Sequence, residues 1–316
     1  MTQAFRIMIL AVMLVTLLGC SPSNKLERIV IATTPWLGYY PLYYADEIQL
    51  DEQLGIDLEI IENLSTNDFR RSIVKSYIDG FASSIQGVSQ INQILTTPLD
   101  LVLFTNFSSG GDVIIARKSI TALSELEGKR VGFRRNEISH FVALNALKLE
   151  DLTEDDIHHI EANPLDAVEM FERREIDAFV TYPPISISLL KDPDLHVIFT
   201  SKSLPIPVLD CIVFKGDRSE SKQQKLIQLW DAAIKKIRSQ PNAYLQFLSS
   251  QLGTTMPEAK KNLEGITLLT LDEQKGLFSS PEQIKEILLR ACEVSGTKAS
   301  LCIRDLHFIR FGGLQL

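Results

Sequence analysis

The chain has 316 residues, with 40 acidic and 32 basic side chains and a formal net charge of −8 at pH 7. This acidic balance, without a Lys/Arg cluster, argues against nucleic-acid binding, whose affinity comes mainly from neutralising phosphates. Hydrophobic residues make up 45% of the chain, and its length is natural for two cores rather than one.

The N-terminal segment has the pattern of an export signal. Its apolar run at 7–18 is shorter than the roughly 20 residues that a membrane-spanning helix needs. We therefore predict a cleaved signal peptide at 1–19. The sequence LLGC, which ends at Cys20, resembles a bacterial lipobox and implies a lipid-anchored linker at 20–27 on a protein of the periplasm or cell surface. An ordinary signal peptide that contains a cysteine is the alternative.

The other cysteines show no metal-site spacing. Cys292 and Cys302 can form a disulfide across a short loop in an oxidising compartment, or they can remain reduced. Cys211 lies in the apolar pattern VLDCIVF, which predicts a buried thiol. The adjacent His158 and His159 lie in a polar stretch and are expected at the surface, so no metal is predicted.

Short β-branched runs alternate with longer stretches of helical periodicity, which is typical of an α/β protein. The first set of predicted elements comprises strands at 28–34, 56–61, 81–84 and 99–105 and helices at 41–50, 67–80 and 86–95. The second set comprises strands at 112–117, 129–133, 158–162, 176–182 and 195–201 and helices at 124–128, 139–148 and 165–175. A strand at 208–215 is expected to rejoin the first sheet, and the chain after 219 is mostly helical.

Two segments separate these sets of elements: Gly110-Gly111 and the LPIPV segment with Pro205 and Pro207. We predict a first lobe of 28–110 and 206–316 and a second lobe of 111–205. Glycine tolerates large changes of φ and ψ, whereas proline stiffens the returning strand. The two crossings are therefore expected to act as a hinge, with simple turns as the alternative.

The segment ATTPWLGYYPLYYADE holds one of the two tryptophans and four of the seven tyrosines. It follows the first predicted strand, and ligands of open α/β sheets bind at the carboxyl ends of strands. Trp36, Tyr39 and Tyr40 are therefore expected to enclose an organic ligand with flat rings and N–H or O–H donors. Tyr43 and Tyr44 lie one helical turn further on and are expected to pack in the core.

Polar residues after the other strands of the first lobe extend this candidate site: Ser83, Ser84, Gln86, Asn106, Ser108 and Ser109. Hydroxyls and backbone N–H groups at helix starts suit an oxyanion or a carboxylate. Serines at such positions serve equally well as helix caps, so both roles remain open.

The second lobe and the returning strand complete the candidate ring with Asn136, Ser139, Tyr182 and Asp210. Asn136 or Ser139 is the expected N-cap of a helix whose start faces the cleft. A buried carboxylate at Asp210 needs a partner. A ligand amine, a ring N–H or a backbone amide of the protein would each supply it.

Four stretches together resemble a known family. They are WLGYYPLYYADEIQL at 36–50, SSGGDVIIARKSITALSELEGKRVGF at 108–133, AVEMFERREIDAFVTYPP at 167–184 and the lipobox. Over 29–295 their order and spacing are similar to the nitrate/sulfonate/taurine/thiamine-precursor group of ABC-transporter substrate-binding proteins, the SsuA/THI5-like and NMT1-like family. The resemblance implies the two-lobed type II periplasmic-binding-protein fold, an α/β architecture with a mostly parallel sheet in each lobe, flanked by helices.

The resemblance also implies a lipid-anchored, extracytoplasmic receptor. It would capture a small organic or oxyanionic ligand, such as a sulfonate, taurine, nitrate or a pyrimidine, and deliver it to an ABC permease. The alternatives are a periplasmic sensor that docks on and regulates a membrane signalling protein, and a lipoprotein with a structural role. The sequence has no GxSxG elbow, HExxH motif or P-loop. We therefore expect a monomeric binding protein that is not an enzyme and needs no cofactor.

Overall fold

The computed structural model describes residues 25–62, 66–92, 95, 98–135, 137–204, 208–216 and 218–277, together with 282, 286, 289 and 309–310. Several predictions lie outside these residues: the signal peptide, the lipid site at Cys20, the Cys292–Cys302 pair, Asn136, Pro205 and Pro207. In the described part of the chain, no helix is both long enough and apolar enough to span a membrane.

The first sheet has the strand order β11-β4-β10-β3-β1-β2, with β12 beside β4. Its strands are β1 (Glu27–Thr33), β2 (Ile56–Glu62), β3 (Gly80–Ser84), β4 (Leu99–Ser108), β10 (Val208–Lys215), β11 (Ile266–Leu268) and β12 (Ile309–Arg310). β1 is parallel to β2 and β3, whereas β10 lies antiparallel between β3 and β4. The sheet is therefore mixed rather than mostly parallel, because the chain leaves it through β4 and returns through β10 in the opposite direction.

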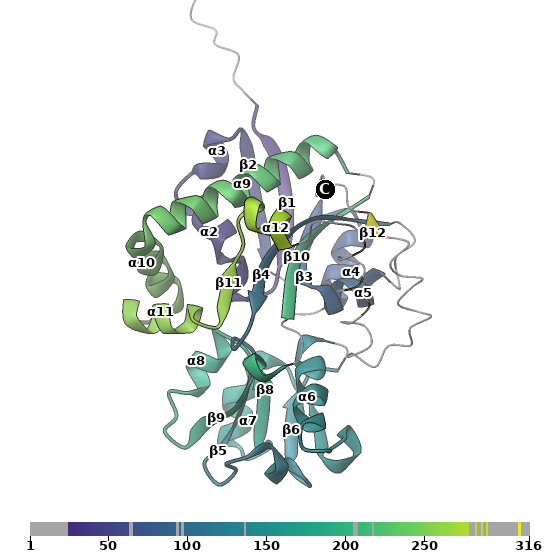
Figure 1. Cartoon of the computed structure of the whole chain (residues 1–316), viewed down its shortest axis with the longest axis vertical. Helices are drawn as coiled ribbons and strands as arrows, with labels where there is room; N and C mark the ends of the chain where they lie inside the picture. The colour runs from purple at the N-terminus through teal and green to yellow at the C-terminus, as the bar shows by residue number, and fades with distance from the viewer. Residues whose placement is uncertain are drawn as a thin grey trace, which may run out of the picture.

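The second sheet has the order β7-β6-β8-β5-β9. Its strands are β5 (Val113–Arg117), β6 (Arg130–Phe133), β7 (His158–Glu161), β8 (Ala178–Thr181) and β9 (Leu195–Thr200). β6 is parallel to β7 and β8, and β5 is antiparallel to β8 and β9, so this sheet is also mixed. Figure 1 shows it with its helices below the first sheet, along the long axis of the molecule.

Helices flank both sheets. With the first sheet lie α2 (Tyr40–Glu47), α3 (Leu50–Gln53), α4 (Thr66–Val74), α5 (Ile85–Asn92), α9 (Glu220–Ser239), α10 (Pro241–Leu252), α11 (Met256–Leu263) and α12 (Leu271–Leu277). With the second lie α6 (Ile138–Lys148), α7 (Ala167–Glu172) and α8 (Ile185–Leu189). The helix predicted at 124–128 is instead a short 3-10 turn, Leu123–Leu126.

The long helix α9 shows why the C-terminal periodicity predicts helices. Its apolar side chains recur at helical spacing and are buried in one cluster with α2 and β1: Leu226, Leu229, Trp230, Ala233 and Ile237. Such a stripe stabilises a helix mainly through burial against its neighbours. α9 therefore covers one face of the first sheet (Figure 1).

The chain crosses between the sheets twice, from β4 to β5 and from β9 to β10. Ser201 ties the two crossings together, because its Oγ accepts hydrogen bonds from Gly110 N at 2.8 Å and Asp112 N at 3.3 Å. Gly265, just before β11, packs against the first crossing. A Cβ atom there would lie 2.5 Å from Gly111 N, which leaves no room for a side chain. The crossings are thus held closely to each other and to the first sheet.

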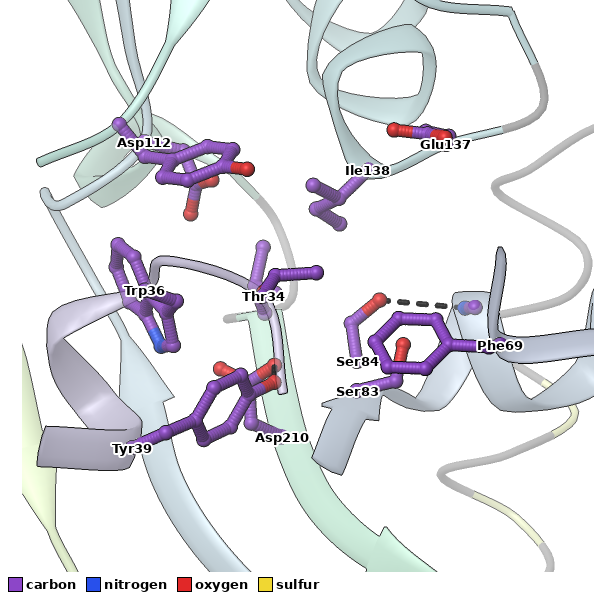
Figure 2. A pocket seen from close by; sticks show the side chains of 13 residues that line it. Thr34, Trp36, Tyr39, Phe69, Ser83, Ser84, Asp112, Glu137, Ile138 and Asp210 are labelled. Atoms are coloured by element: carbon purple, nitrogen blue, oxygen red, sulfur yellow. Dashed lines mark hydrogen bonds between the residues drawn. The ribbon is translucent and has the colours of Figure 1, made fainter. Parts of the chain in front are cut away.

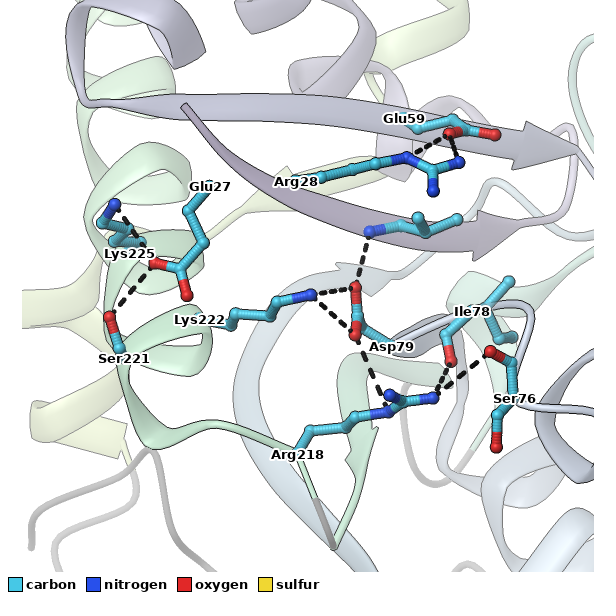
Figure 3. Close-up of polar contacts among 11 residues, drawn as sticks. Glu27, Arg28, Glu59, Ser76, Ile78, Asp79, Arg218, Ser221, Lys222 and Lys225 are labelled. Carbon is cyan, nitrogen blue, oxygen red and sulfur yellow. Dashed lines mark hydrogen bonds and ion pairs between the residues drawn. The ribbon is translucent and has the colours of Figure 1, made fainter. Parts of the chain in front are cut away.

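Asp79 joins strand β1, helix α9 and the segment just before α9 through polar contacts (Figure 3). The residue is 5% exposed, and its Oδ2 accepts a hydrogen bond from Val30 N of β1 at 2.9 Å. Lys222 Nζ of α9 donates to both oxygens, at 3.0 and 2.9 Å, and Arg218 Nε lies 3.7 Å from Oδ1. Burying a carboxylate is unfavourable without such partners. This network therefore joins α9 to β1.

The variant Asp79→Ala is expected to lower the free energy of unfolding by about 2 to 4 kcal/mol, measured in urea. The loss arises because Val30 N and Lys222 Nζ are left without their acceptor. Glu59→Ala is the control, since the ion pair of Glu59 with Arg28 is exposed, with side chains 43% and 63% accessible. Its effect should be much smaller. Equal losses in the two variants would contradict this role of Asp79.

Candidate ligand-binding site

A cavity lies between the two sheets, with a volume of about 550 Å³ that includes the solvent at its mouth. Elements of the first sheet line it with Thr34, Trp36, Tyr39, Phe69, Ser83, Ser84, Gly87, Val208 and Asp210. Elements of the second line it with Asp112, Glu137, Ile138 and Tyr182. Thr34 follows β1, Ser83 and Ser84 end β3, and Tyr182 follows β8, so the carboxyl ends of these strands meet at the cavity. This is where open α/β sheets bind ligands; Figure 2 shows Thr34, Ser83 and Ser84 in the wall.

Two aromatic rings form a corner of the cavity. Trp36 follows β1 and Tyr182 follows β8, and their ring centroids are 5.7 Å apart with the planes at 85°. Trp36 Nε1 donates a hydrogen bond to Asn106 Oδ1 at 3.2 Å, which fixes the indole from behind. The ring contact between Trp36 and Tyr182 joins residues of both sheets, so the corner depends on how the two sheets are placed.

Asp210 and Tyr39 form a buried polar pair in the cavity wall. The Tyr39 hydroxyl donates to Asp210 Oδ1 at 2.8 Å, and Asp210 is 4% exposed. Burial raises the pKa of Asp210 to about 8, with the Asp112 carboxylate adding to the rise and hydrogen bonds from Tyr39 and Trp36 opposing it. The Asp210 carboxyl group of the ligand-free protein is therefore largely protonated at neutral pH.

Asp112 is a second buried acid, placed just before β5. Ser108 Oγ donates a hydrogen bond to its Oδ2 at 2.6 Å. Burial raises the pKa of Asp112 to about 6, although the hydrogen bond from Ser108 opposes the rise. Figure 2 shows Asp112 above the cavity and Asp210 below it, so the two carboxyl groups enter the same space from different sheets.

Glu137 is the third acid of the wall and occupies the N-cap position of α6. Its Oε1 lies 3.7 Å from Arg134 Nη1. Among the described lining residues there are three carboxyl groups and no lysine or arginine. The described wall of the cavity is therefore acidic and aromatic.

The structure brings six of the sequence-predicted residues to the cavity: Trp36, Tyr39, Ser83, Ser84, Tyr182 and Asp210. Ser84 also acts as a cap, because its Oγ accepts a hydrogen bond from Gly87 N at 3.2 Å at the start of α5. Contact of these residues with a ligand remains a prediction.

Other predicted residues lie behind the wall rather than in it. The ring of Tyr40 packs against Tyr43, with centroids 5.2 Å apart. Gln86 is buried, and its Oε1 has no hydrogen-bond partner among the described residues. Asn106 supports Trp36, and Ser108 supports Asp112. These residues shape the cavity indirectly.

Two further predicted residues point elsewhere. Ser109 is exposed and lines a separate surface hollow with Phe107, Ser201, Leu204 and Thr267. Ser139 is not the N-cap of α6, because Glu137 holds that position. Its Oγ instead accepts a hydrogen bond from Arg134 N at 3.1 Å, which fixes the loop that precedes the helix.

Predictions outside the cavity have mixed outcomes. Cys211 is a buried free thiol, as predicted, and Tyr44 packs in the core against Tyr244. The surface position expected for His159 is wrong, because its side chain is 7% exposed and its ring centroid lies 4.2 Å from that of Phe133. No group of three His, Cys, Asp or Glu side chains that could hold a metal ion occurs among the described residues.

Sequence reasoning missed several lining residues: Thr34, Phe69, Gly87, Asp112, Glu137, Ile138 and Val208. Asp112 had a signal, because it closes the SSGGD segment that carries part of the family resemblance. Glu137 lies in RRNEISH, directly before a predicted helix. Phe69 and Val208 resemble ordinary core residues in the sequence and carried no signal.

The raised pKa of Asp210 predicts that this residue costs stability as the pH rises. An unfolded aspartate has a pKa near 3.9, so between about pH 4 and pH 8 the folded protein binds a proton at Asp210 that the unfolded chain has lost. The contribution of Asp210 to the free energy of unfolding should fall by up to about 1.4 kcal/mol per pH unit over this window.

Urea denaturation of the wild type and of Asp210→Asn at several pH values tests this expectation. The variant should gain stability relative to the wild type as the pH rises to about 8, and the difference should then level off. Asp57→Asn, an exposed acid on β2, is the matched control. A difference between Asp210→Asn and wild type that does not change with pH would contradict the assignment.

Solved proteins share this fold. The periplasmic aliphatic sulphonate binding protein SsuA from Escherichia coli has a TM-score of 0.69 and 16% identity, covering 85% of this chain and 86% of that chain. The alkanesulfonate-binding protein SsuA from Xanthomonas axonopodis pv. citri, bound to MOPS, has a TM-score of 0.72 and 15% identity, covering 88% of this chain and 97% of that chain. The zinc-bound ligand binding component of an ABC-type import system from Staphylococcus aureus has a TM-score of 0.68 and 14% identity, covering 88% of this chain and 99% of that chain.

Identities of this size show a shared fold, and the predicted α/β type II periplasmic-binding-protein fold is thereby confirmed, with mixed sheets. A comparison with curated protein sequences gives no match. The model of the NMT1/THI5-like family matches residues 37–240, which confirms the resemblance drawn from the sequence segments. The chain belongs to the NMT1/THI5-like family.

Proposed function

We propose that this chain is the extracytoplasmic substrate-binding component of an ABC-type importer and that its role is binding, not catalysis. The cavity between the two sheets carries this proposal, because residues of both sheets line it. The family membership and the structural likeness to sulfonate-binding proteins and to a component of an ABC-type import system support it. Lipid on Cys20 would hold the protein at the membrane.

The proposed mechanism is closure of two lobes around the ligand. The first lobe is formed by 28–110 and 206–316 and the second by 111–205. Gly110, in the first crossing, has a φ of 119°, a conformation that favours glycine. A few residues of this kind can absorb the backbone change of a hinge while each sheet stays rigid. Closure would bury the ligand and would present one defined surface to a permease.

Trp36 and Tyr182 would report on this closure, because they touch each other from different lobes. A ligand in the cavity would replace water around their rings. The two rings offer a large apolar surface at little cost in rotamer entropy. The ligand is therefore expected to be a small organic molecule with a flat or aliphatic body.

The two tryptophans give a direct test of ligand capture. Trp36 lines the cavity, whereas Trp230 is 1% exposed in the core and donates from Nε1 to Leu269 O at 2.8 Å. A bound ligand should change the emission of Trp36 and leave that of Trp230 unchanged. Trp36→Phe should abolish the fluorescence response and weaken binding at least tenfold, while Trp230→Phe should retain both.

The probes for this test are alkanesulfonates, taurine, nitrate, aminopyrimidines and small amines. A bound probe at 100 times its dissociation constant should stabilise the protein by about 2.7 kcal/mol, measured by thermal denaturation. Small-angle scattering should show a smaller radius of gyration with that probe. The proposal fails if no probe stabilises the wild type, or if Trp36→Phe responds as the wild type does.

A further inference from the structure

We propose that the ligand of this cavity carries a protonated amine, which Asp112 and Asp210 bind between them beside the rings of Trp36 and Tyr182. This inference rests on the proposed binding function and adds the chemical class of the ligand. It follows from the charges, the hydrogen bonds and the ring geometry of the described wall.

The first observation is the charge of the wall. Asp112, Asp210 and Glu137 line the cavity, and no described lining residue is basic. Arg134 lies outside the lining and is 3.7 Å from Glu137, so the charges of these two residues offset each other. Asp112 and Asp210 remain without a basic partner among the described lining residues. An anionic group in this space would oppose ionisation of the carboxyl groups from both sheets, whereas a bound cation would stabilise their charged forms and favour loss of the proton from Asp210.

The second observation concerns the helix starts, which are the usual alternative for binding an anion. At α5, the N–H of Gly87 is already bonded to Ser84 Oγ. At α6, the N-cap residue is Glu137, whose side chain forms no capping hydrogen bond but brings a carboxylate to the positive end of the helix dipole. A sulfonate or nitrate at the start of α5 would therefore compete with Ser84 for Gly87 N, and one at the start of α6 would lie beside the carboxylate of Glu137.

The third observation is that the buried acids have only neutral donors. Tyr39 donates to Asp210, and Ser108 donates to Asp112, but no described lysine or arginine forms an ion pair with either residue. A buried carboxylate is stabilised in its charged form by a cation, which the protein supplies to Asp79 through Lys222. An ammonium group between Asp112 and Asp210 would supply it in the cavity.

The fourth observation is the aromatic corner. The rings of Trp36 and Tyr182 are in edge-to-face contact, with centroids 5.7 Å apart and planes at 85°, so a group bound beside this pair can lie against a ring face. The faces of aromatic rings attract cations. Phe69 and Ile138, elsewhere in the wall, would contact an apolar body attached to the amine.

Matched probes that differ only in the charged group test this inference by calorimetry with the full protein. The pairs are 2-phenylethylamine with 2-phenylethanol, and butylamine with butanesulfonate. We expect each amine to bind at least tenfold more tightly than its partner. Asp210→Asn and Asp112→Asn should each weaken amine binding at least tenfold, and Asp57→Asn should not change it.

The same titrations measure the number of protons released when the amine binds. This number separates direct binding by the Asp210 carboxylate from a structural role of that carboxylate. Because Asp210 has a raised pKa of about 8, a bound amine should drive a proton from it, and affinity should rise up to tenfold per pH unit between pH 6 and pH 8. Asp210→Asn should abolish the proton release above about pH 7, where Asp112, with a pKa of about 6, has already lost its proton, while keeping an oxygen acceptor for Tyr39. The other titratable or charged groups around Asp210 are Tyr39, Asp112, Tyr182, Cys211 and the pair Glu137 and Arg134.

Each outcome decides a different claim. If butanesulfonate binds and the amines do not, or if Asp210→Asn leaves amine binding and proton release unchanged, the amine inference is wrong and the binding function stands. If no probe in this set or in the broader panel binds, both proposals fail. Thermal denaturation of each ligand-free variant shows whether it is folded, so that only folded variants enter the comparison.

Discussion

The double passage of the chain between its two sheets is the constraint on which the rest of the structure depends. The first passage ends at Asp112, directly before β5, and the second leads into β10, where Asp210 pairs with Asn106 and Ser84. Because β10 returns antiparallel into the first sheet, its beginning lies at the same edge as the carboxyl ends of β1 and β3. Each passage thus carries one carboxyl group to the cavity, and a movement of the sheets at these passages would change the distance between the two.

Two buried aspartates show how the protein treats structural and site carboxylates differently. Asp79 has Lys222 and Arg218 beside it, so its charge is compensated within the fold. Asp210 has the phenol of Tyr39 as a hydrogen-bond donor, and burial raises its pKa. A group that costs stability in the folded protein is more often retained for function than for packing. The contrast between the two sites therefore favours a role of Asp210 in binding.

Much of the fold could be predicted from the sequence, because continuous apolar runs and helical periodicity report burial directly, as in β1 and α9. Strand pairing could not be predicted in the same way, because a buried apolar run looks alike in parallel and antiparallel neighbours. The antiparallel strands β10 and β11 make the first sheet mixed. Tyr40 was predicted to line the cavity, but it packs against Tyr43 instead. The 3-10 turn Leu37–Tyr39 rotates by about 120° per residue, so Trp36 and Tyr39 fall on one side and Tyr40 on another. Asp112 and Glu137 look like turn and cap residues in the sequence, and only the contact between sheets makes them part of one wall.

The shared fold constrains the backbone of the site far more than its chemistry. At 14 to 16% identity to the solved sulfonate-binding and importer proteins, with TM-scores of 0.68 to 0.72, the fold is shared, but the side chains after each strand are free to differ. Ligand class is decided by those few side chains, since the sheets contribute the same strand ends to every member of the fold. In this chain they are carboxyl groups and aromatic rings with neutral hydrogen-bond donors behind them. The lining of the cavity, and not the names of proteins with the same fold, is therefore the physical basis for assigning the ligand.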